Sequence, residues 1–193
     1  MSALFNLLKK ILSGRKIIGL GLMSGTSADG TDLALVEFSQ QSKPGLLAAE
    51  TYPFPSDVRR KILALQEARK VSLEDLILTS QFLGNYWADE IQKFLRKAKT
   101  SNPDFIASHG QTVRHIPEIK KIFNQLQRGS LQIGEVEIIA KRLRIMAISD
   151  FRAGDVALGG SGAPLMPFVH KFLFSSPKEI RAVLNIGGIS NLT

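Results

Sequence analysis

Residues 24–30, SGTSADG, have the composition of a phosphate-binding turn. The glycines allow positive φ and a close approach of the backbone, while successive amides and three hydroxyl groups can donate hydrogen bonds to phosphoryl oxygens. A carboxylate in such a turn repels phosphate unless a divalent cation lies between them, so Asp29 or Asp32 indicates magnesium, held through water. A hairpin turn of this composition also forms without any ligand, and the residues alone leave that alternative open.

The turn matches neither of the two familiar phosphate motifs that lead into a helix. A Walker loop requires a Gly-Lys-Ser/Thr ending, and no lysine lies between Ile18 and Phe38. In a dinucleotide fingerprint the second gap between glycines is one residue shorter than the gap between Gly21 and Gly25. The residues after the turn alternate like a strand, so a turn between two strands is predicted.

Two further sets of polar residues follow predicted buried strands. His109, Gln111 and Thr112 offer directional hydrogen bonds of the kind that a sugar needs. Asp150 can accept a proton from water or a hydroxyl group and is a candidate general base. The alternatives are a structural histidine at 109, and an aspartate at 150 that pairs with Arg152 or caps a turn.

The glycine-rich segments 159–162 and 184–193 are predicted to be a loop and a second hairpin. Gly-Gly-Ser-Gly at 159–162 is too flexible for a helix interior and favours a ligand-wrapping loop. LNIGGISNLT has the same predicted order as the segment around SGTSADG, namely a strand, a glycine turn and a second strand, with Gly187 and Gly188 at the turn. Two such turns facing each other could hold opposite sides of a triphosphate. The sequence contains no cluster of histidines and carboxylates with metal-ligand spacing.

The elements that position these groups begin with strands and continue with helix-connected strands. The expected order is strands at 16–22, 32–38 and 46–52, helices at 56–70 and from residue 72, a short strand at 103–110 ending in a polar loop, a helix at 133–143, a strand at 144–150, a helix at 167–174 and a strand from 181. Trp87 is predicted to be a core residue. This order predicts an α/β fold with a ribonuclease H-like domain of the actin/Hsp70/sugar-kinase group.

Composition indicates a globular protein. The 193 residues are 44% hydrophobic and include no cysteine, which excludes disulfides and thiolate chemistry. The net charge of +8 is spread along the chain without a basic patch interleaved with aromatic residues, so nucleic-acid binding is not predicted.

The N-terminal segment is apolar but is interrupted by Lys9 and Lys10, which excludes a signal peptide and a transmembrane segment, and we expect a cytoplasmic protein. A short amphipathic helix here is expected either to pack on the domain or to touch a membrane surface.

Several stretches, in the family's order, resemble the anhydro-N-acetylmuramic acid kinases, bacterial enzymes of the actin/Hsp70/sugar-kinase fold. They are GLMSGTSADGTDLALV, SHGQTVRH, LQIGE, SDFRAGDVALGGSGAPLMP and LNIGGISNLT, and they cover most of the chain from about residue 17 onward. Three positions depart from the family pattern: Ala28 stands for a larger apolar residue, Arg114 for an aromatic residue and Ser161 for glutamine. Arg114 and Ser161 bear on how the substrate fits.

The resemblance implies an ATP-dependent reaction in peptidoglycan recycling and amino-sugar catabolism. Water opens the 1,6-anhydro bridge of anhydro-N-acetylmuramic acid at the anomeric carbon, and the released O6 takes the γ-phosphoryl group of ATP. The products are N-acetylmuramic acid 6-phosphate and ADP. The implied cofactors are ATP and Mg²⁺, the latter neutralising charge on the transferred phosphoryl group.

The resemblance also assigns residues to this reaction. Asp150 is implied as the base that activates water, and Asp29 as the metal residue, through water. The implied sugar side is formed by His109, Gln111 and Thr112. The resemblance implies two loops that bind the phosphates of ATP. The first comprises Gly25, Thr26, Ser27, Ala28, Asp29, Gly30, Thr31 and Asp32, and the second contains Gly187 and Gly188.

The resemblance covers the N-terminal half of the family only. We therefore expect an N-terminal extension at 1–16, a first kinase domain at 17–176 and the start of a second domain at 177–193. Without the rest of that domain, which closes over the substrate, the chain alone is expected to be inactive. The alternatives are a non-catalytic sugar- or nucleotide-binding remnant, a kinase for another sugar, or one subunit of a split enzyme. Expected partners are the anhydro amino sugar, ATP, a C-terminal half as a separate chain and a second copy in a homodimer.

Overall fold

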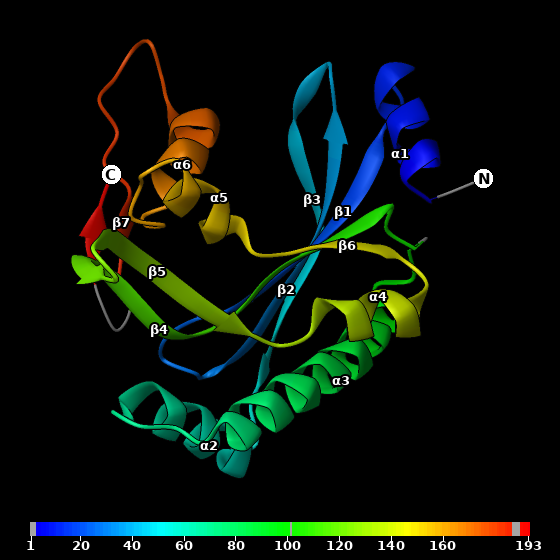
Figure 1. Cartoon of the computed structure of the whole chain (residues 1–193). Coiled ribbons are helices and arrows are strands. Elements are labelled where there is room, and N and C mark those ends of the chain that lie inside the picture. The colour runs from blue at the N-terminus through cyan, green and yellow to red at the C-terminus, as the bar shows by residue number, and fades with distance from the viewer. Residues whose placement is uncertain (1–2, 101, 187–189) are drawn as a thin grey trace. The chain divides into compact units, whose positions relative to one another are not determined.

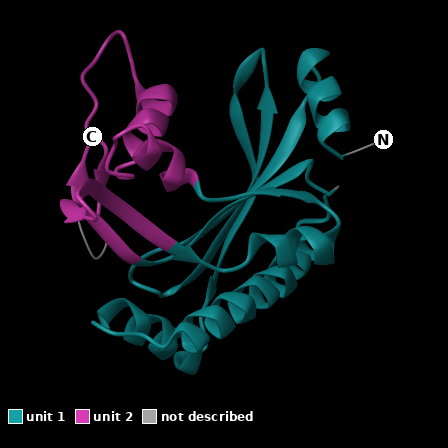
Figure 2. Cartoon of the chain, viewed as in Figure 1, with its two compact units in different colours: residues 1–113, 132–150 teal, residues 114–131, 151–193 magenta. Residues whose placement is uncertain are grey.

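The chain divides into two compact units, which are described separately. The computed structural model describes residues 3–100, 102–186 and 190–193 (Figure 1). Unit 1 comprises residues 1–113 and 132–150, and unit 2 comprises residues 114–131 and 151–193 (Figure 2). These units do not coincide with the expected domains, and the expected boundary between residues 176 and 177 stays a prediction.

A mixed sheet forms the framework of unit 1. Its strands are β1 (Ile17–Ser24), β2 (Gly30–Ser39), β3 (Ser42–Pro53), β4 (Phe105–Ile122), β5 (Gln125–Ile133) and β6 (Met146–Ile148). The order is β3-β2-β1-β4-β5, and β6 pairs with β4 off this path. β1, β2 and β3 pair antiparallel, whereas β4 is parallel to both β1 and β6. The predicted antiparallel meander followed by parallel strands is therefore confirmed, and the fold is mixed α/β.

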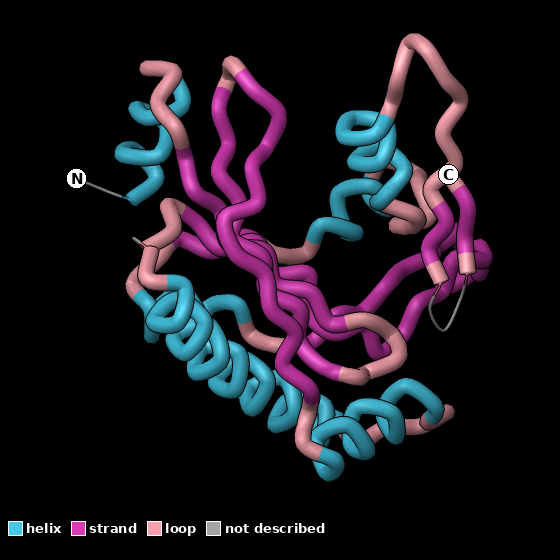
Figure 3. Tube along the Cα trace, turned by 180° about the vertical axis from the view of Figure 1, so that it is seen from behind, coloured by secondary structure: helices cyan, strands magenta, loops and turns pink. Residues whose placement is uncertain are grey.

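Helices cover one face of this sheet and form the core with it. They are α2 (Ser56–Glu67), α3 (Leu73–Ala98) and α4 (Val136–Leu143), with α1 (Ala3–Leu12) preceding β1 (Figure 3). The predicted cap is confirmed, since Ser72 Oγ accepts a hydrogen bond from the Asp75 amide at 3.5 Å. Trp87 of α3 is fully buried, and its Nε1–H donates to Thr31 Oγ1 at 2.9 Å. Trp87 is thus a core residue, as predicted, and it ties α3 to the start of β2.

The prediction of a polar loop after residue 108 is wrong, because β4 continues through it to Ile122. The chain then returns as β5 after a turn at Phe123 and Asn124, whose φ values of 48° and 62° suit a tight two-residue hairpin. Residues 109–122 include glycine, proline and several charged residues, so they carry little hydrophobic alternation. Pairing with neighbouring strands, which local sequence does not reveal, makes them a strand.

Unit 2 contains the tip of the β4–β5 hairpin, two helices and a second small hairpin. Its further elements are α5 (Phe151–Ala157), which was not predicted, α6 (Met166–Phe174), β7 (Leu184–Asn185) and β8 (Asn191–Leu192). β7 and β8 pair antiparallel, which confirms the predicted second hairpin. Gly187 and Gly188 lie outside the described residues. Among the described helices, none is long and apolar enough to cross a membrane.

Candidate functional site

The carboxyl ends of β1 and β6, with the part of β4 that pairs with both strands, carry the predicted site residues of unit 1. β1 leads directly into the SGTSADG turn, and its Leu22 pairs with Ser108 of β4. The last registered pair of β4 and β6 joins Ala107 to Ile148. His109 and Asp150 therefore each follow the pair of Ala107 and Ile148 by two positions, although β4 continues past His109 and pairs with β1 as far as Gln111. The predicted adjacency of the two strands is confirmed, whereas His109 lies within β4 and not at its end.

The turn itself has a compact interior and an exposed outer side. The Ala28 amide donates to Gly25 O at 3.1 Å, and Ala28 is fully buried with a φ of 51°. A Cβ at Gly30 would lie 2.3 Å from Tyr52 O, so only glycine fits there. Thr26 and Asp29 are exposed. The side chains of Ala28 and Thr31 stabilise the turn from inside, which leaves the residues between Gly25 and Asp29 as its outward-facing part.

Gln111 joins the turn to β4 from beneath. Its side chain is fully buried, its Oε1 accepts from Ser24 Oγ at 2.6 Å, and its Nε2 donates to Gly25 O at 3.1 Å. Ser24 and Gln111 are opposite each other in the β1–β4 register, although 87 positions separate them in sequence. The side-chain amide of Gln111 is therefore bonded to the first two residues of the SGTSADG turn. Contact of Gln111 with a sugar stays a prediction, and the structure adds a role that sequence reasoning missed.

We expect Gln111→Met to destabilise both the fold and the turn. Methionine preserves the length of the side chain but leaves the Gly25 carbonyl without this donor, so the free energy of unfolding should fall by about 1–3 kcal/mol. Urea denaturation measures the loss, and hydrogen exchange should show faster exchange of the amides at 25–30. Gln127→Met on the exposed face of β5 is the matched control and should change stability by less than about 0.5 kcal/mol. Equal effects of the two substitutions would contradict the conclusion that the Gln111 side chain holds the turn against β4.

Thr112 and His109 are also engaged within unit 1. Thr112 is nearly buried, its Oγ1 accepts from Gln132 Nε2 at 3.1 Å, and its carbonyl accepts from Gln66 Nε2 at 2.9 Å. His109 is half-buried, with Nδ1 3.0 Å from Gly110 O. Because a carbonyl oxygen can only accept, this bond requires the proton on Nδ1 and leaves the lone pair of the neutral ring on Nε2. Their sugar-binding roles stay predictions.

Arg59 of α2 is a cationic neighbour of the turn that sequence reasoning did not identify. Its Nη2 lies 3.2 Å from Asp29 Oδ1 and 3.4 Å from Ser27 O. Both side chains are largely exposed, Arg59 to 47% and Asp29 to 70%, so the ion pair stabilises little and can open at low cost. The approach of α2 follows from the end of β3, where the Phe54 amide donates to Asp29 O at 3.0 Å.

The carboxylates around the turn fit magnesium only in company with a phosphate. Within residues 3–100, 102–186 and 190–193, no three His, Cys, Asp or Glu side chains cluster as a metal site. Asp32 already accepts a hydrogen bond from Thr51 Oγ1 at 2.6 Å, whereas the exposed carboxylate of Asp29 pairs with Arg59. Magnesium commonly takes one or two carboxylates together with phosphate oxygens and water. Asp29 fits that mode of binding.

Asp150 presents an exposed carboxylate from an unusual backbone conformation. It lies two residues after β6, and its φ of 59° falls in the left-handed region that few residues other than glycine adopt. Such strained backbone is common at functional sites. The predicted position beyond the carboxyl end of a strand is therefore confirmed, while the catalytic role stays a prediction.

The loop at 159–162 in unit 2 is held by two side chains of the preceding helix α5. Arg152 Nη1 donates to Gly162 O at 2.6 Å, and Asp155 Oδ2 accepts from the Gly162 amide at 2.7 Å. Burial lowers the pKa of the Arg152 guanidinium from its ordinary value. Arg152 and Asp155 of α5 thus both hold this loop at Gly162.

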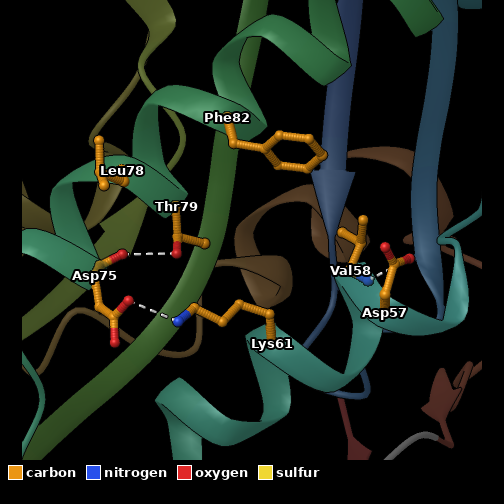
Figure 4. A pocket seen from close by; sticks show the side chains of 7 residues that line it. All are labelled: Asp57, Val58, Lys61, Asp75, Leu78, Thr79 and Phe82. Carbon is orange, nitrogen blue, oxygen red and sulfur yellow. Dashed lines mark hydrogen bonds and ion pairs between the residues drawn. The ribbon is translucent and has the colours of Figure 1, made fainter.

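A pocket of about 270 Å³ lies between α2 and α3 of unit 1 (Figure 4). Its lining includes the ion pair of Lys61 Nζ with Asp75 Oδ1 at 2.8 Å and the apolar side chains of Leu78 and Phe82. None of the predicted site residues lines it, so the pocket and the sheet edge are separate features.

Similarity to known proteins centres on one family. A family model described as anhydro-N-acetylmuramic acid kinase matches residues 17–193. Relatives of that name include those of Caldanaerobacter subterraneus subsp. tengcongensis, 40% identical over 191 residues that cover 96% of this chain and 48% of the relative, and Mannheimia succiniciproducens, 41% identical over 176 residues that cover 90% and 45%. The relative from Pasteurella multocida is 42% identical over 176 residues, again covering 90% and 45%. The chain spans about half the length of the curated relatives it matches.

Proposed function

Because the chain belongs to the anhydro-N-acetylmuramic acid kinase family, we propose that it serves the ATP-dependent opening and phosphorylation of 1,6-anhydro-N-acetylmuramic acid. The observation that carries this proposal is that the turn follows β1, Asp150 follows β6, and His109 lies in β4, which is parallel to and paired with both of these strands. Antiparallel β3, β2 and β1 followed by parallel β4 and β6 also support a ribonuclease H-like fold of the actin/Hsp70/sugar-kinase group.

In this proposal, different residues near this edge of the sheet serve ring opening, sugar binding and phosphate binding. Asp150 takes a proton from water, whose oxygen attacks the anomeric carbon as the bond from that carbon to O6 breaks. The released O6 then takes the γ-phosphoryl group, and ADP leaves. His109 and Thr112 position the sugar, while the outward-facing part of the turn, from Gly25 to Asp29, binds the phosphates of ATP.

Two further parts of the phosphate site belong to this proposal. Magnesium, when bound through water at Asp29, supplies neutralisation of the phosphoryl charge. Gly187 and Gly188 contribute a second phosphate loop, with β7 and β8 supplying the flanking strands.

The proposal is tested by product formation. The chain is incubated with ATP, Mg²⁺ and the anhydro sugar, once alone and once with a polypeptide that completes the length of the Caldanaerobacter relative. We expect N-acetylmuramic acid 6-phosphate and ADP in equal amounts in the completed mixture, detected by mass spectrometry and ³¹P NMR. ADP release without sugar phosphate, or sugar binding without any product in either mixture, would contradict the proposed activity.

Arg59 provides a sharper test of the phosphate loop. Arg59 lies beside the turn, where its guanidinium could donate a hydrogen bond to a bound phosphate, and Asp29 would be the residue that holds magnesium through water. We therefore expect Arg59→Ala to weaken binding of Mg·ATP by about tenfold, the loss of one charge-assisted hydrogen bond. Titration calorimetry measures the change. The neighbouring exposed Arg60 is the matched control, because Arg60→Ala removes the same charge without touching the turn. Equal losses in both variants would indicate a general charge effect instead.

A further inference from the structure

Helix α1 exposes nearly all of its apolar residues. Of its large apolar side chains only Leu7 is buried, whereas Leu4, Phe5, Leu8 and Leu12 are exposed to 54%, 52%, 47% and 86%. With about 100° of rotation per residue, these four side chains share one broad arc of the helix surface. Leu7 and Lys10 point to the other side. The apolar arc of α1 therefore faces away from the sheet that it precedes.

Contacts on the opposite side hold the helix in this orientation. Lys10 pairs with Asp104, whose second carboxylate oxygen accepts from the Ile18 amide of β1 at 2.9 Å. Gln40, between β2 and β3, donates to the Ile11 carbonyl at 2.9 Å. These bonds attach the last turn of α1 to the rest of unit 1, and Leu7 is buried in the middle of the helix. The apolar arc is thus exposed although α1 is attached to the rest of unit 1.

The charge around the arc selects the kind of surface that α1 fits. No acidic residue precedes Asp29 in the sequence, whereas Lys9 lies in α1 beside the apolar arc and Arg15 follows the helix. Lys10 and Lys16 are paired with Asp104 and Glu37. An apolar arc edged by cations complements the interface of a bilayer with anionic headgroups. A second copy of the same arc would instead bring like charges together.

The geometry points to α1 as a peripheral docking element for an anionic lipid surface. The apolar arc enters the headgroup region, Lys9 and Arg15 contact the headgroup charges, and unit 1 stays outside the bilayer. The helix precedes the family match, which begins at residue 17, so this interaction does not rest on the proposed kinase function. No described helix can span a membrane, which is consistent with α1 lying along the surface.

Vesicle flotation tests the inference with the full chain. Binding to vesicles that contain phosphatidylglycerol should exceed binding to pure phosphatidylcholine and should fall at high salt. Phe5→Ser/Leu8→Ser should lower the partition coefficient by about tenfold or more, and Lys9→Glu by about fivefold or more. The matched control is Phe123→Ser/Leu126→Ser, which removes an even more exposed Phe and Leu from the β4–β5 hairpin and should bind like the wild type.

Three outcomes would overturn the inference. They are equal binding of the wild type to both vesicle types, unchanged binding of the α1 double variant, and an equal loss in the hairpin control. Sedimentation velocity tests the alternative that a second copy of the chain binds the apolar arc. A wild-type dimer that dissociates in the α1 double variant, without any lipid binding, would assign the arc to that second copy. Circular dichroism of each variant verifies that the helix and the fold are retained.

Discussion

Asp150→Asn should lower kcat by about 10²–10⁴-fold in the assembly that forms the 6-phosphate, with sugar ring opening and phosphoryl transfer lost together. Asparagine retains the size of the side chain and its position after β6, but its amide cannot take a proton from the attacking water. Phosphorylation is lost as well, because O6 becomes available only when the anhydro bridge opens.

Kinetics and binding together separate this role from a structural one. The KM for ATP and the calorimetric affinity for the sugar should stay within about threefold of the wild type, since Asp150 acts only when charge moves in the transition state. Asp89→Asn in α3 is a matched control, because Asp89 pairs with Arg142 away from the sheet edge. Near-normal turnover of Asp150→Asn would remove Asp150 from the base role, whereas equal losses in both variants would indicate damage to the fold.

Gly134→Ala should destabilise unit 1 by about 3 kcal/mol or more, the combined cost of overpacking and of a strained backbone. The φ of Gly134 is +106°, and a Cβ there would lie 1.9 Å from Cζ3 of Trp87. Trp87 cannot move freely because its ring is fully buried and its Nε1–H is bonded to Thr31 Oγ1 at 2.9 Å. The clash is therefore transmitted to Thr31 at the start of β2, immediately after the SGTSADG turn.

Urea denaturation measures this effect against a matched glycine. Gly129→Ala in β5 introduces the same methyl group where no atom lies within 4 Å, so it should change the free energy of unfolding by less than about 1 kcal/mol. In a Trp87→Leu background the Gly134→Ala substitution should cost at least about 1 kcal/mol less than in the wild type, because the two sites are coupled. A cost for Gly134→Ala that matches the Gly129 control would contradict the steric argument.

The sequence predicted much of the framework because its signals are local. Alternating apolar residues and glycine-rich turns identified the meander of β1, β2 and β3, and the serine before α3 identified that helix start. Asp150 was placed beyond a strand because the apolar run before it ends there. The same local signals failed for residues 109–122 and for α5. In both segments glycine and charged residues mask the period, and pairing or packing with distant residues decides the structure.

By itself the sequence determined which residue types could bind phosphate, contact a sugar or accept a proton, and in which order they occur. Only the tertiary structure decided which of them face one another. It buried Gln111 beneath Ser24 and Gly25, set Arg59 against Asp29, and paired the strands that carry His109 and Asp150. The physical reason is that hydrophobic periodicity and turn chemistry act over a few residues, whereas strand register joins positions as distant as Ser24 and Gln111, 87 residues apart.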